Sequence, residues 1–121
     1  MHKLKELKVW ERSVKLSKTI YQLTKGFPDS ERFGLVSQLN RCSVSIPSNI
    51  AEGAGRNTAG EFNQFLGISI GSLYELETQL IISNEIGLIS KNSLEIISNE
   101  IEEINKMLIG LKKSLSTKKG V

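Results

Sequence analysis

The side chains that most often carry out catalysis are few in this sequence. It holds one histidine, His2, and one cysteine, Cys42. A zinc site takes about four such ligands, and a di-iron site in a helical bundle takes Glu-x-x-His motifs from two helices. Cys42 falls on an apolar helical stripe and has no histidine base, which favours a small core residue over a nucleophile. We therefore expect no metal site, no cofactor, no catalytic residue and no enzyme.

A glycine-rich turn is the next candidate site. Gly53-Ala54-Gly55-Arg56 resembles a phosphate-binding loop. Such loops follow a strand and end in Gly-Lys-Ser/Thr, whereas this one follows a helical pattern. The two glycines are more typical of a helix C-terminus, where glycine adopts the positive φ that ends a helix. We expect a helix end here, with a phosphate loop as the weaker alternative.

Two further groups of polar side chains are candidates for a site, one beside this turn and one on the helix that follows it. Asn49, Glu52 and Arg56 form one polar cluster. Because buried polar groups are usually hydrogen-bonded, we expect these three to tie their helix to its neighbours, with a ligand site as the alternative. Glu75 and Glu77 lie on an acidic helix and are more typical of a solvated or interfacial surface than of a catalytic pair.

Basic residues concentrate at the two ends of the chain. Lys and Arg outnumber Asp and Glu by 7 to 2 over residues 1–27 and by 6 to 4 over residues 91–121, and the formal net charge is +3. This asymmetry permits an anionic partner such as nucleic acid. A basic stripe is often only a solvated face, but it also suits phosphate contact. The candidate phosphate contacts are Lys5, Lys8, Arg12 and Lys15, on one side of the first helix, and Arg41.

The first helical segment is apolar on two sides. Leu7, Trp10, Val14 and Tyr21 form one stripe at about 100° per residue, and a second stripe begins at Val9. The aromatic side chains could stack on bases, but their aliphatic neighbours favour packing in the core or at a subunit interface. Two apolar stripes need two partner surfaces, so we expect a homo-oligomer with Trp10, Val14 and Tyr21 at its interface.

Four predicted helices position these residues. Apolar residues recur at spacings of 3 and 4 in four segments separated by Gly, Pro and capping residues, and no segment alternates like a strand. The predicted helices span about 5–25, 30–54, 58–88 and 93–115, and the tail 116–121 is expected to be disordered. The short connections predict one domain over residues 1–115, an all-α, antiparallel up-down-up-down four-helix bundle.

Local signals add detail to these helices. Thr58 and Glu61 form a predicted capping box at the start of the third helix, and Asn92 is the predicted cap of the fourth. Pro47 falls inside the second helix, where it removes a backbone donor and clashes with the carbonyl of Ser43, so we predict a kink. Serines beside the proline can hydrogen-bond the backbone groups that the kink frees.

The composition predicts a cytoplasmic protein. One cysteine excludes an internal disulfide, and the first residues contain no apolar leader. The longest uncharged run, residues 62–74, has 13 residues, fewer than the roughly 20 that a membrane-spanning helix needs. We therefore expect a soluble protein with no membrane partner.

Several stretches resemble the four-helix bundle proteins associated with the 23S rRNA intervening sequence in bacteria. The resemblance covers about residues 7–90 and is most specific in Ser-Ile-Pro-Ser-Asn-Ile-Ala-Glu-Gly-x-Gly-Arg, whose motif residues are Pro47, Asn49, Glu52, Gly53, Gly55 and Arg56. Further matches are Phe33-Gly34-Leu35-x-x-Gln38-Leu39, Glu61-Phe62-x-x-Phe65-Leu66 and Gly71-Ser72-Leu73-x-Glu75-Leu76-Glu77-x-Gln79-Leu80. Relatives often carry paired arginines where this chain has Asn40-Arg41, a departure that weakens a basic groove on the second helix.

The resemblance implies an antiparallel four-helix bundle that assembles as a ring, typically a homopentamer, with a role related to nucleic acid. It brings no catalytic residues. We therefore expect a non-enzymatic, oligomeric accessory protein for RNA or another nucleic acid. The alternative is a structural scaffold that binds another protein and no nucleic acid. No small-molecule substrate is expected in either case.

Overall fold

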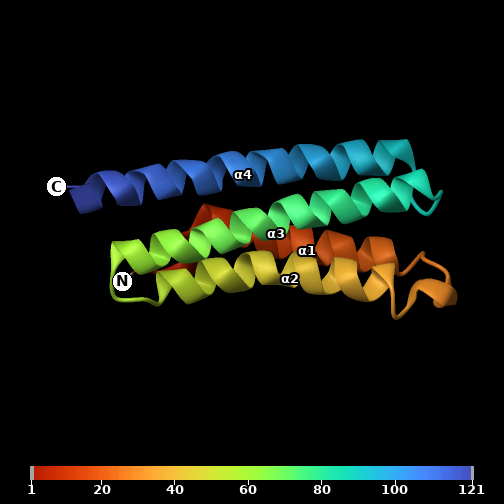
Figure 1. Ribbon diagram of the computed structural model, residues 1–121, viewed down its shortest axis with the longest axis horizontal. Helices are drawn as coiled ribbons and strands as arrows, with labels where there is room; N and C mark the ends of the chain where they lie inside the picture. The colour runs from red at the N-terminus through yellow and green to blue at the C-terminus, as the bar shows by residue number, and fades with distance from the viewer. Residues whose placement is uncertain (1, 121) are drawn as a thin grey trace.

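The chain folds into four α-helices in a computed structural model that describes the backbone of residues 2–120 and the side chains of residues 2–117. The helices are α1 (Lys8–Thr24), α2 (Leu35–Ala54), α3 (Ala59–Glu85) and α4 (Lys91–Gly120), with 3₁₀ turns at Leu4–Glu6 (η1) and Asp29–Glu31 (η2). No strand occurs in this described part. Each helix runs back alongside the one before it (Figure 1), and the predicted all-α four-helix bundle is confirmed.

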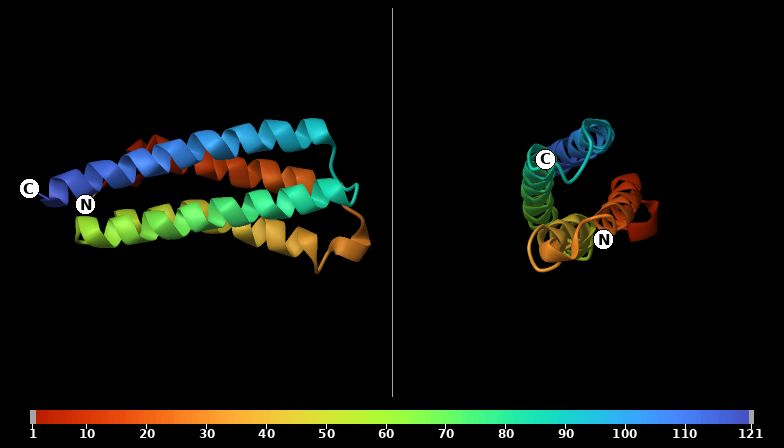
Figure 2. Two further views of the ribbon diagram at one scale, coloured as in Figure 1. Left: turned by 45° about the horizontal axis from the view of Figure 1, so that its top comes forward. Right: turned by 90° about the vertical axis from the view of Figure 1, so that its right-hand side faces the viewer.

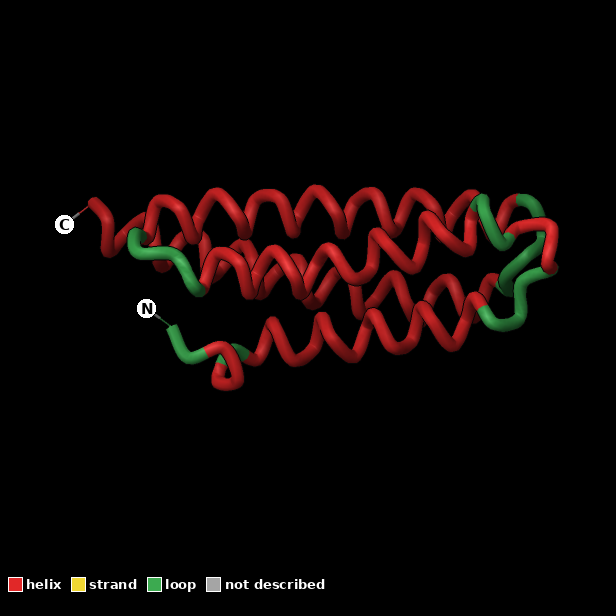
Figure 3. The backbone as a smooth tube through the Cα atoms, turned by 90° about the horizontal axis from the view of Figure 1, so that it is seen from below, coloured by secondary structure: helices red, strands yellow, loops and turns green. Residues whose placement is uncertain are grey.

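The helices follow one another around the bundle in chain order, as the end-on view of Figure 2 shows. Helices α2 and α3 share the most extensive contact, and α1 and α4, which close the circle, share the sparsest among neighbours. The α2–α3 turn lies at the end of the bundle that also holds both chain termini, and the other two connections lie at the opposite end (Figure 3). The two basic ends of the sequence therefore meet.

Each helix buries one face in a common core. Side chains three and four residues apart share a helix face, and the buried positions repeat at that spacing. The largest fully buried apolar side chains come from all four helices: Ile20, Leu39, Ile46, Ile50, Phe62, Leu66, Leu73, Leu76, Leu80, Ile104 and Leu108. Each contributes about 1.5–3 kcal/mol of transfer free energy. This core determines which side chains are left on the surface.

The starts of α3 and α4 test the predicted caps. The Thr58 hydroxyl accepts a hydrogen bond from the Glu61 amide at 3.1 Å, which confirms the N-cap of α3. The Glu61 carboxylate accepts from the Thr58 hydroxyl, at 3.1 Å. The predicted cap Asn92 is wrong, because the Ser90 hydroxyl accepts from the Ser93 amide at 3.0 Å and α4 begins directly after Ser90.

The first two helices begin later than predicted. Residues 4–6 form a separate 3₁₀ turn because Leu7 is extended, with φ −83° and ψ 105°, and α1 begins after it. Residues 29–34 form a 3₁₀ turn and a further turn, and Gly34, with φ −108° and ψ −111°, separates them from α2. Lys5 therefore lies outside α1 and out of register with the lysines of that helix.

The last two helices end elsewhere than predicted. Helix α3 stops at Glu85, and Gly87 then adopts φ +82°, a conformation that glycine reaches without strain. Helix α4 continues through most of the segment 116–121 that was predicted as a disordered tail. The last residue of the chain and the side chains of residues 118–120 lie outside the described part.

Gly53 and Gly55 do not end α2 through a positive φ, so that prediction is wrong. The positive φ among the described residues belongs to Gly87. Gly53 lies inside α2, and Gly55 follows the helix with φ −83°. A Cβ atom at Gly53 would lie 2.8 Å from Phe62 Cδ1 and 2.8 Å from Phe65 Cβ. The glycine is needed because the last turn of α2 packs directly on the first turns of α3.

Helix α2 continues through Pro47 without a break, and the bend predicted there stays a prediction. The proline lacks the amide that would bond the carbonyl of Ser43. The Ser17 hydroxyl of α1 donates to that carbonyl at 2.8 Å. The open acceptor is thus satisfied by a serine of the neighbouring helix, and the packing of α1 on α2 compensates for the proline.

Candidate nucleic-acid interface

Both chain termini lie at the same end of the bundle (Figure 1), and the segments next to them carry exposed lysines. Lys3, Lys5 and Lys8 come from the N-terminal segment and Lys113 comes from the C-terminal part of α4, and all four side chains are exposed. We call these four side chains the basic end. Lys3 and Lys113 were not among the phosphate contacts predicted from the sequence. The excess of Lys and Arg in both terminal segments could have indicated them. An even number of antiparallel helices places both chain ends at the same end of the bundle.

Lys8 and Lys15 lie on the exposed side of α1. Lys15 Nζ is 3.8 Å from Glu11 Oε1. An exposed pair of this kind contributes roughly 0–1 kcal/mol, so Lys15 can still meet a phosphate. Lys5 belongs to the turn before the helix and not to the same row.

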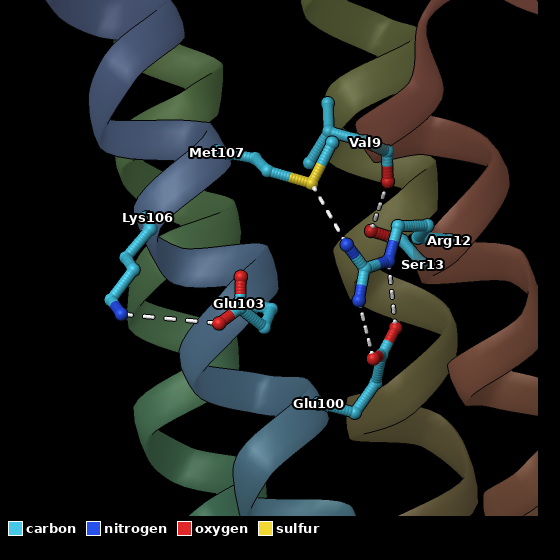
Figure 4. Close-up of polar contacts among 7 residues, drawn as sticks. All are labelled: Val9, Arg12, Ser13, Glu100, Glu103, Lys106 and Met107. Atoms are coloured by element: carbon cyan, nitrogen blue, oxygen red, sulfur yellow. Dashed lines mark hydrogen bonds and ion pairs between the residues drawn. The ribbon is translucent and has the colours of Figure 1, made fainter.

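Arg12, predicted as a phosphate contact in this row, is engaged within the molecule (Figure 4). Its Nη2 donates to Glu100 Oε1 at 2.6 Å, its Nε donates to Glu100 Oε2 at 3.0 Å, and its Nη1 lies 3.6 Å from the sulfur of Met107. The hydrogen bond to Glu100 raises the pKa of Arg12. This two-point pair joins α1 to α4 where the neighbouring helices touch least. The geometry argues against the predicted role, because the guanidinium is already occupied.

Arg41 lies apart from the lysines, on the face where α2 packs against α3. Its guanidinium makes no ion pair with any side chain of residues 2–117. The five predicted phosphate contacts are therefore dispersed: Lys5 and Lys8 belong to the basic end, Arg12 and Lys15 lie further along α1, and Arg41 lies on the α2–α3 face. They do not form one surface.

A polar groove of about 510 Å³ lies between α2 and α3 around Arg41, and we call it the α2–α3 groove. It is lined by Ser37, Gln38, Arg41, Cys42, Ser45 and Asn49 of α2 and by Ile68, Ser72, Glu75 and Gln79 of α3. The hydroxyls of Ser45 and Ser72 lie 2.7 Å apart. The Gln79 amide nitrogen lies 3.4 Å from Glu75 Oε2, and the buried Gln79 Oε1 has no partner in the described structure. The groove thus holds charged and polar groups that the fold does not fully satisfy.

Cys42 lines the same groove as a buried side chain. Its thiol donates to the Ser72 carbonyl at 3.1 Å. Burial, and to a smaller extent Glu75, raises the pKa of Cys42 to about 12. The thiolate is the reactive form of cysteine, so this thiol is protonated at neutral pH, in keeping with the core role predicted for it.

Asn49, Glu52 and Arg56 are not brought together as one cluster. The Asn49 side-chain amide donates to the Ser45 carbonyl at 2.8 Å, within α2. Glu52 and Arg56 form an exposed ion pair at 3.1 Å, and the Arg56 guanidinium carbon lies 4.9 Å from the centroid of the Phe65 ring. In the described structure the side-chain hydrogen bonds of these three residues stay within residues 45–56, and contact with the neighbouring helix comes from the stacking of Arg56 over Phe65 instead of the predicted hydrogen bonds. The arrangement does not converge on a ligand.

The residues predicted at an oligomer interface differ in exposure. Trp10 is half-buried and packs against the core, whereas Val14 is 41% exposed and Tyr21 is 46% exposed. Helix α3 and the residue that follows it add a further set of exposed apolar side chains: Ile68, Tyr74, Ile81, Ile82 and Ile86. Apolar exposure of this kind marks interaction surfaces when it is contiguous.

Two further kinds of feature are absent from the part of the chain that the structure describes. Within this part, no group of three or more His, Cys, Asp or Glu side chains is placed to hold a metal ion. None of the described helices combines the length and the apolar character that crossing a membrane requires.

Sequence and fold both relate the chain to a known family. The sequence model described as 23S rRNA-intervening sequence protein matches residues 5–110. The fold is that of a crystal structure of a protein with unknown function from the S23 ribosomal protein family of Bacteroides thetaiotaomicron, with a TM-score of 0.81, 28% sequence identity, and coverage of 87% of this chain and 95% of that chain. No curated protein matches the sequence. The chain belongs to the 23S rRNA-intervening sequence protein family.

Proposed function

We propose that this protein is a non-enzymatic, homo-oligomeric accessory protein of the bacterial cytoplasm that binds RNA or another nucleic acid through the basic end. The observation that carries the proposal is that the N-terminal segment, with exposed Lys3, Lys5 and Lys8, and the C-terminal part of α4, with exposed Lys113, lie at the same end of the bundle. Phosphate contacts by lysine release counterions and bind nucleic acid without reading its sequence. The family description, which names an rRNA element, supports the same partner.

Oligomerisation makes a modest basic end effective. One copy presents four described lysines there, too few for tight binding at physiological salt. A ring of copies repeats the patch around one rim, so that binding of one copy raises the effective concentration of phosphates at the next. The family resemblance implies five copies, and the exposed Val14 and Tyr21 supply apolar surface for the contact.

A salt series on single-stranded RNA tests the proposal. The plot of log affinity against log salt has a slope of about −0.7 for each phosphate contact with a single strand. The variant Lys5→Glu/Lys8→Glu is expected to weaken binding. It is also expected to make the negative slope shallower by about 1.4 for each copy in contact, because two phosphate contacts are lost. The matched control Arg32→Glu/Lys91→Glu, which makes the same charge change at the opposite end, is expected to weaken binding much less.

Arg12 provides a second control for this experiment. Arg12→Gln removes a cation from the row in which phosphate contacts were predicted, but its charge is paired with Glu100. It is therefore expected to leave the salt slope unchanged. Equal loss of binding in the two double variants, or binding that does not depend on salt, would refute the basic end as the contact surface.

A protein-binding scaffold is the alternative, and the exposed apolar side chains at the C-terminal end of α3 and just after it favour it. Ile82 is 45% exposed and Ile86 is 57% exposed, near the end of the bundle opposite to the basic end. Recovery of one defined protein and no nucleic acid from a bacterial extract, together with RNA titrations that show no binding at low salt, would establish this alternative.

A further inference from the structure

We propose that the α2–α3 groove receives helix α1 of a second copy of the chain, with Val14 against Ile68 and Lys18 against Glu75. The inference rests on the oligomeric assembly proposed above, and it names the two different surfaces that join. It places an apolar residue against an apolar residue and a cation against an anion.

The first surface is an exposed strip on α1. Val14, Ser17, Tyr21 and Thr24 form one row at spacings of 3 and 4 on the helix. Ser17 and Thr24 are buried, and their hydroxyls bond to groups of α2. Val14 and Tyr21, in the same row, therefore lie beside α2 and face solvent. Lys18 is exposed in the next row outward.

The second surface is the α2–α3 groove. Ile68 is the apolar member of its lining that stays exposed, at 47%. Arg41 has no ion-pair partner in the described part of the chain, and Glu75 is exposed and takes one long hydrogen bond from Gln79. The groove therefore offers an apolar contact and two charges that a neighbouring chain can satisfy.

The height of Val14 along the bundle follows from the contacts between helices. Ser17 of α1 bonds to the carbonyl of Ser43 in α2. Because α1 and α2 are antiparallel (Figure 1), Val14 lies level with Ile46. The Ser69 hydroxyl of α3 donates to the Ile46 carbonyl at 2.9 Å. Val14 is thus at the height of Ser69, next to the exposed isoleucine of the groove.

Lys18 and Glu75 also lie at similar heights along the bundle. Lys18 lies four residues beyond Val14, a rise of roughly 6 Å. Helix α3 runs in the same direction as α1, so the corresponding position on α3 is Leu73, four residues beyond Ser69. Glu75 is two residues further along, within reach of a lysine side chain.

These heights matter because the copies in a ring are related by rotation alone. We take the axis of the ring to be parallel to the helices, so that α1 of one copy lies lengthwise in the groove of the next. Rotation about such an axis leaves each residue at its own height, so residues that meet across the interface must already be level within one copy. The strip and the groove lie on the two sides of α2 and face different directions, so the contact is heterologous. Because the two surfaces face different directions, each copy is rotated relative to the copy before it. This rotation favours a closed ring over a straight filament.

Cysteine cross-linking tests the pairing directly. In a Cys42→Ala background, which removes the one natural cysteine, one protein carries Val14→Cys and another carries Ile68→Cys. A disulfide needs Cα atoms within about 7 Å. We expect a cross-linked dimer when the two proteins are mixed under oxidising conditions, and little in either alone. Val14→Cys mixed with Ile109→Cys, exposed on α4, is the control and is expected to cross-link far less.

Two outcomes of this experiment overturn the inference. Cross-linking of Val14→Cys with itself as efficient as in the mixture would show a symmetric contact between two α1 helices. Equal cross-linking to Ile109→Cys would show random collision. Far-ultraviolet circular dichroism of each variant confirms that it is folded before the comparison is made.

A charge reversal provides an independent measurement. Glu75→Lys is expected to lower the light-scattering mass toward the 13.4 kDa of one chain, and Lys18→Glu added to it is expected to restore assembly. Glu85→Lys, exposed on the same helix outside the groove, is expected to keep the wild-type mass. An unchanged mass for Glu75→Lys would overturn the pairing.

Parallel RNA titrations separate this inference from the proposed function. Salt-dependent RNA binding without the Val14–Ile68 cross-link would refute the interface and leave the nucleic-acid role standing. The cross-link without RNA binding would refute the nucleic-acid role and support the interface.

Discussion

Pro47 and Ser17 show how one residue depends on a partner in another helix. A proline inside a helix leaves the carbonyl four residues earlier without its amide donor. Here the Ser17 hydroxyl fills that place, at 2.8 Å from the Ser43 carbonyl oxygen in the buried contact of α1 with α2. The sequence revealed the missing donor. It could not reveal the substitute, because the two residues are 26 positions apart and only the fold brings them together.

The pair gives a prediction for the free energy of unfolding. Ser17→Ala is expected to lower it by about 1–2 kcal/mol, since a buried acceptor loses its donor. In a Pro47→Ala background the helix regains its own amide, so the same serine substitution is expected to cost distinctly less. Urea unfolding of the four proteins in a double-mutant cycle measures the difference. Equal costs in both backgrounds would show that the serine does not serve the proline's carbonyl.

At the scale of the element, the approach of α2 to α3 depends on one glycine. Gly53 is buried, and an added methyl group would meet both Phe62 and Phe65 at 2.8 Å. At Gly55, two residues later, an added methyl group would be 3.6 Å from its nearest neighbour, which is ordinary contact. The two motif glycines therefore have different physical roles.

This difference predicts opposite effects of alanine. Gly53→Ala is expected to lower the free energy of unfolding by about 1–3 kcal/mol, because the core is overpacked. Gly55→Ala, at φ −83°, is expected to be neutral or to stabilise the protein by up to about 1 kcal/mol through the unfolded state. Chemical denaturation followed by circular dichroism measures both. Similar destabilisation at the two positions would contradict the close-packing account.

The sequence predicted the elements better than their ends. Apolar spacing is a local property, and it identified four helices and the buried faces of Leu66, Leu73 and Leu80. The Thr58 cap was also found, because its partner Glu61 is three residues away. The glycine roles and the partner of Arg12 were missed, because they depend on how closely two helices pack and on which helices are neighbours.

At the scale of the whole molecule, helix order decides where charge accumulates. An even number of antiparallel helices returns the C-terminal segment to the N-terminal end (Figure 1). The exposed Lys3, Lys5, Lys8 and Lys113 of these two segments therefore belong to the same end of the bundle. The lysine row predicted on α1 loses Arg12 to the ion pair that joins α1 to α4 (Figure 4). The charge count therefore indicated much of the proposed nucleic-acid surface, while its location required the fold.

We propose that copies of this bundle assemble and that the assembly binds nucleic acid. Light-scattering mass across a salt series, with and without single-stranded RNA, tests both parts in one measurement. We expect a multiple of 13.4 kDa for the protein alone at every salt concentration, and added RNA mass at low salt that is lost as salt rises. A mass of one chain at working concentration, or no added mass with RNA at the lowest salt, would contradict it.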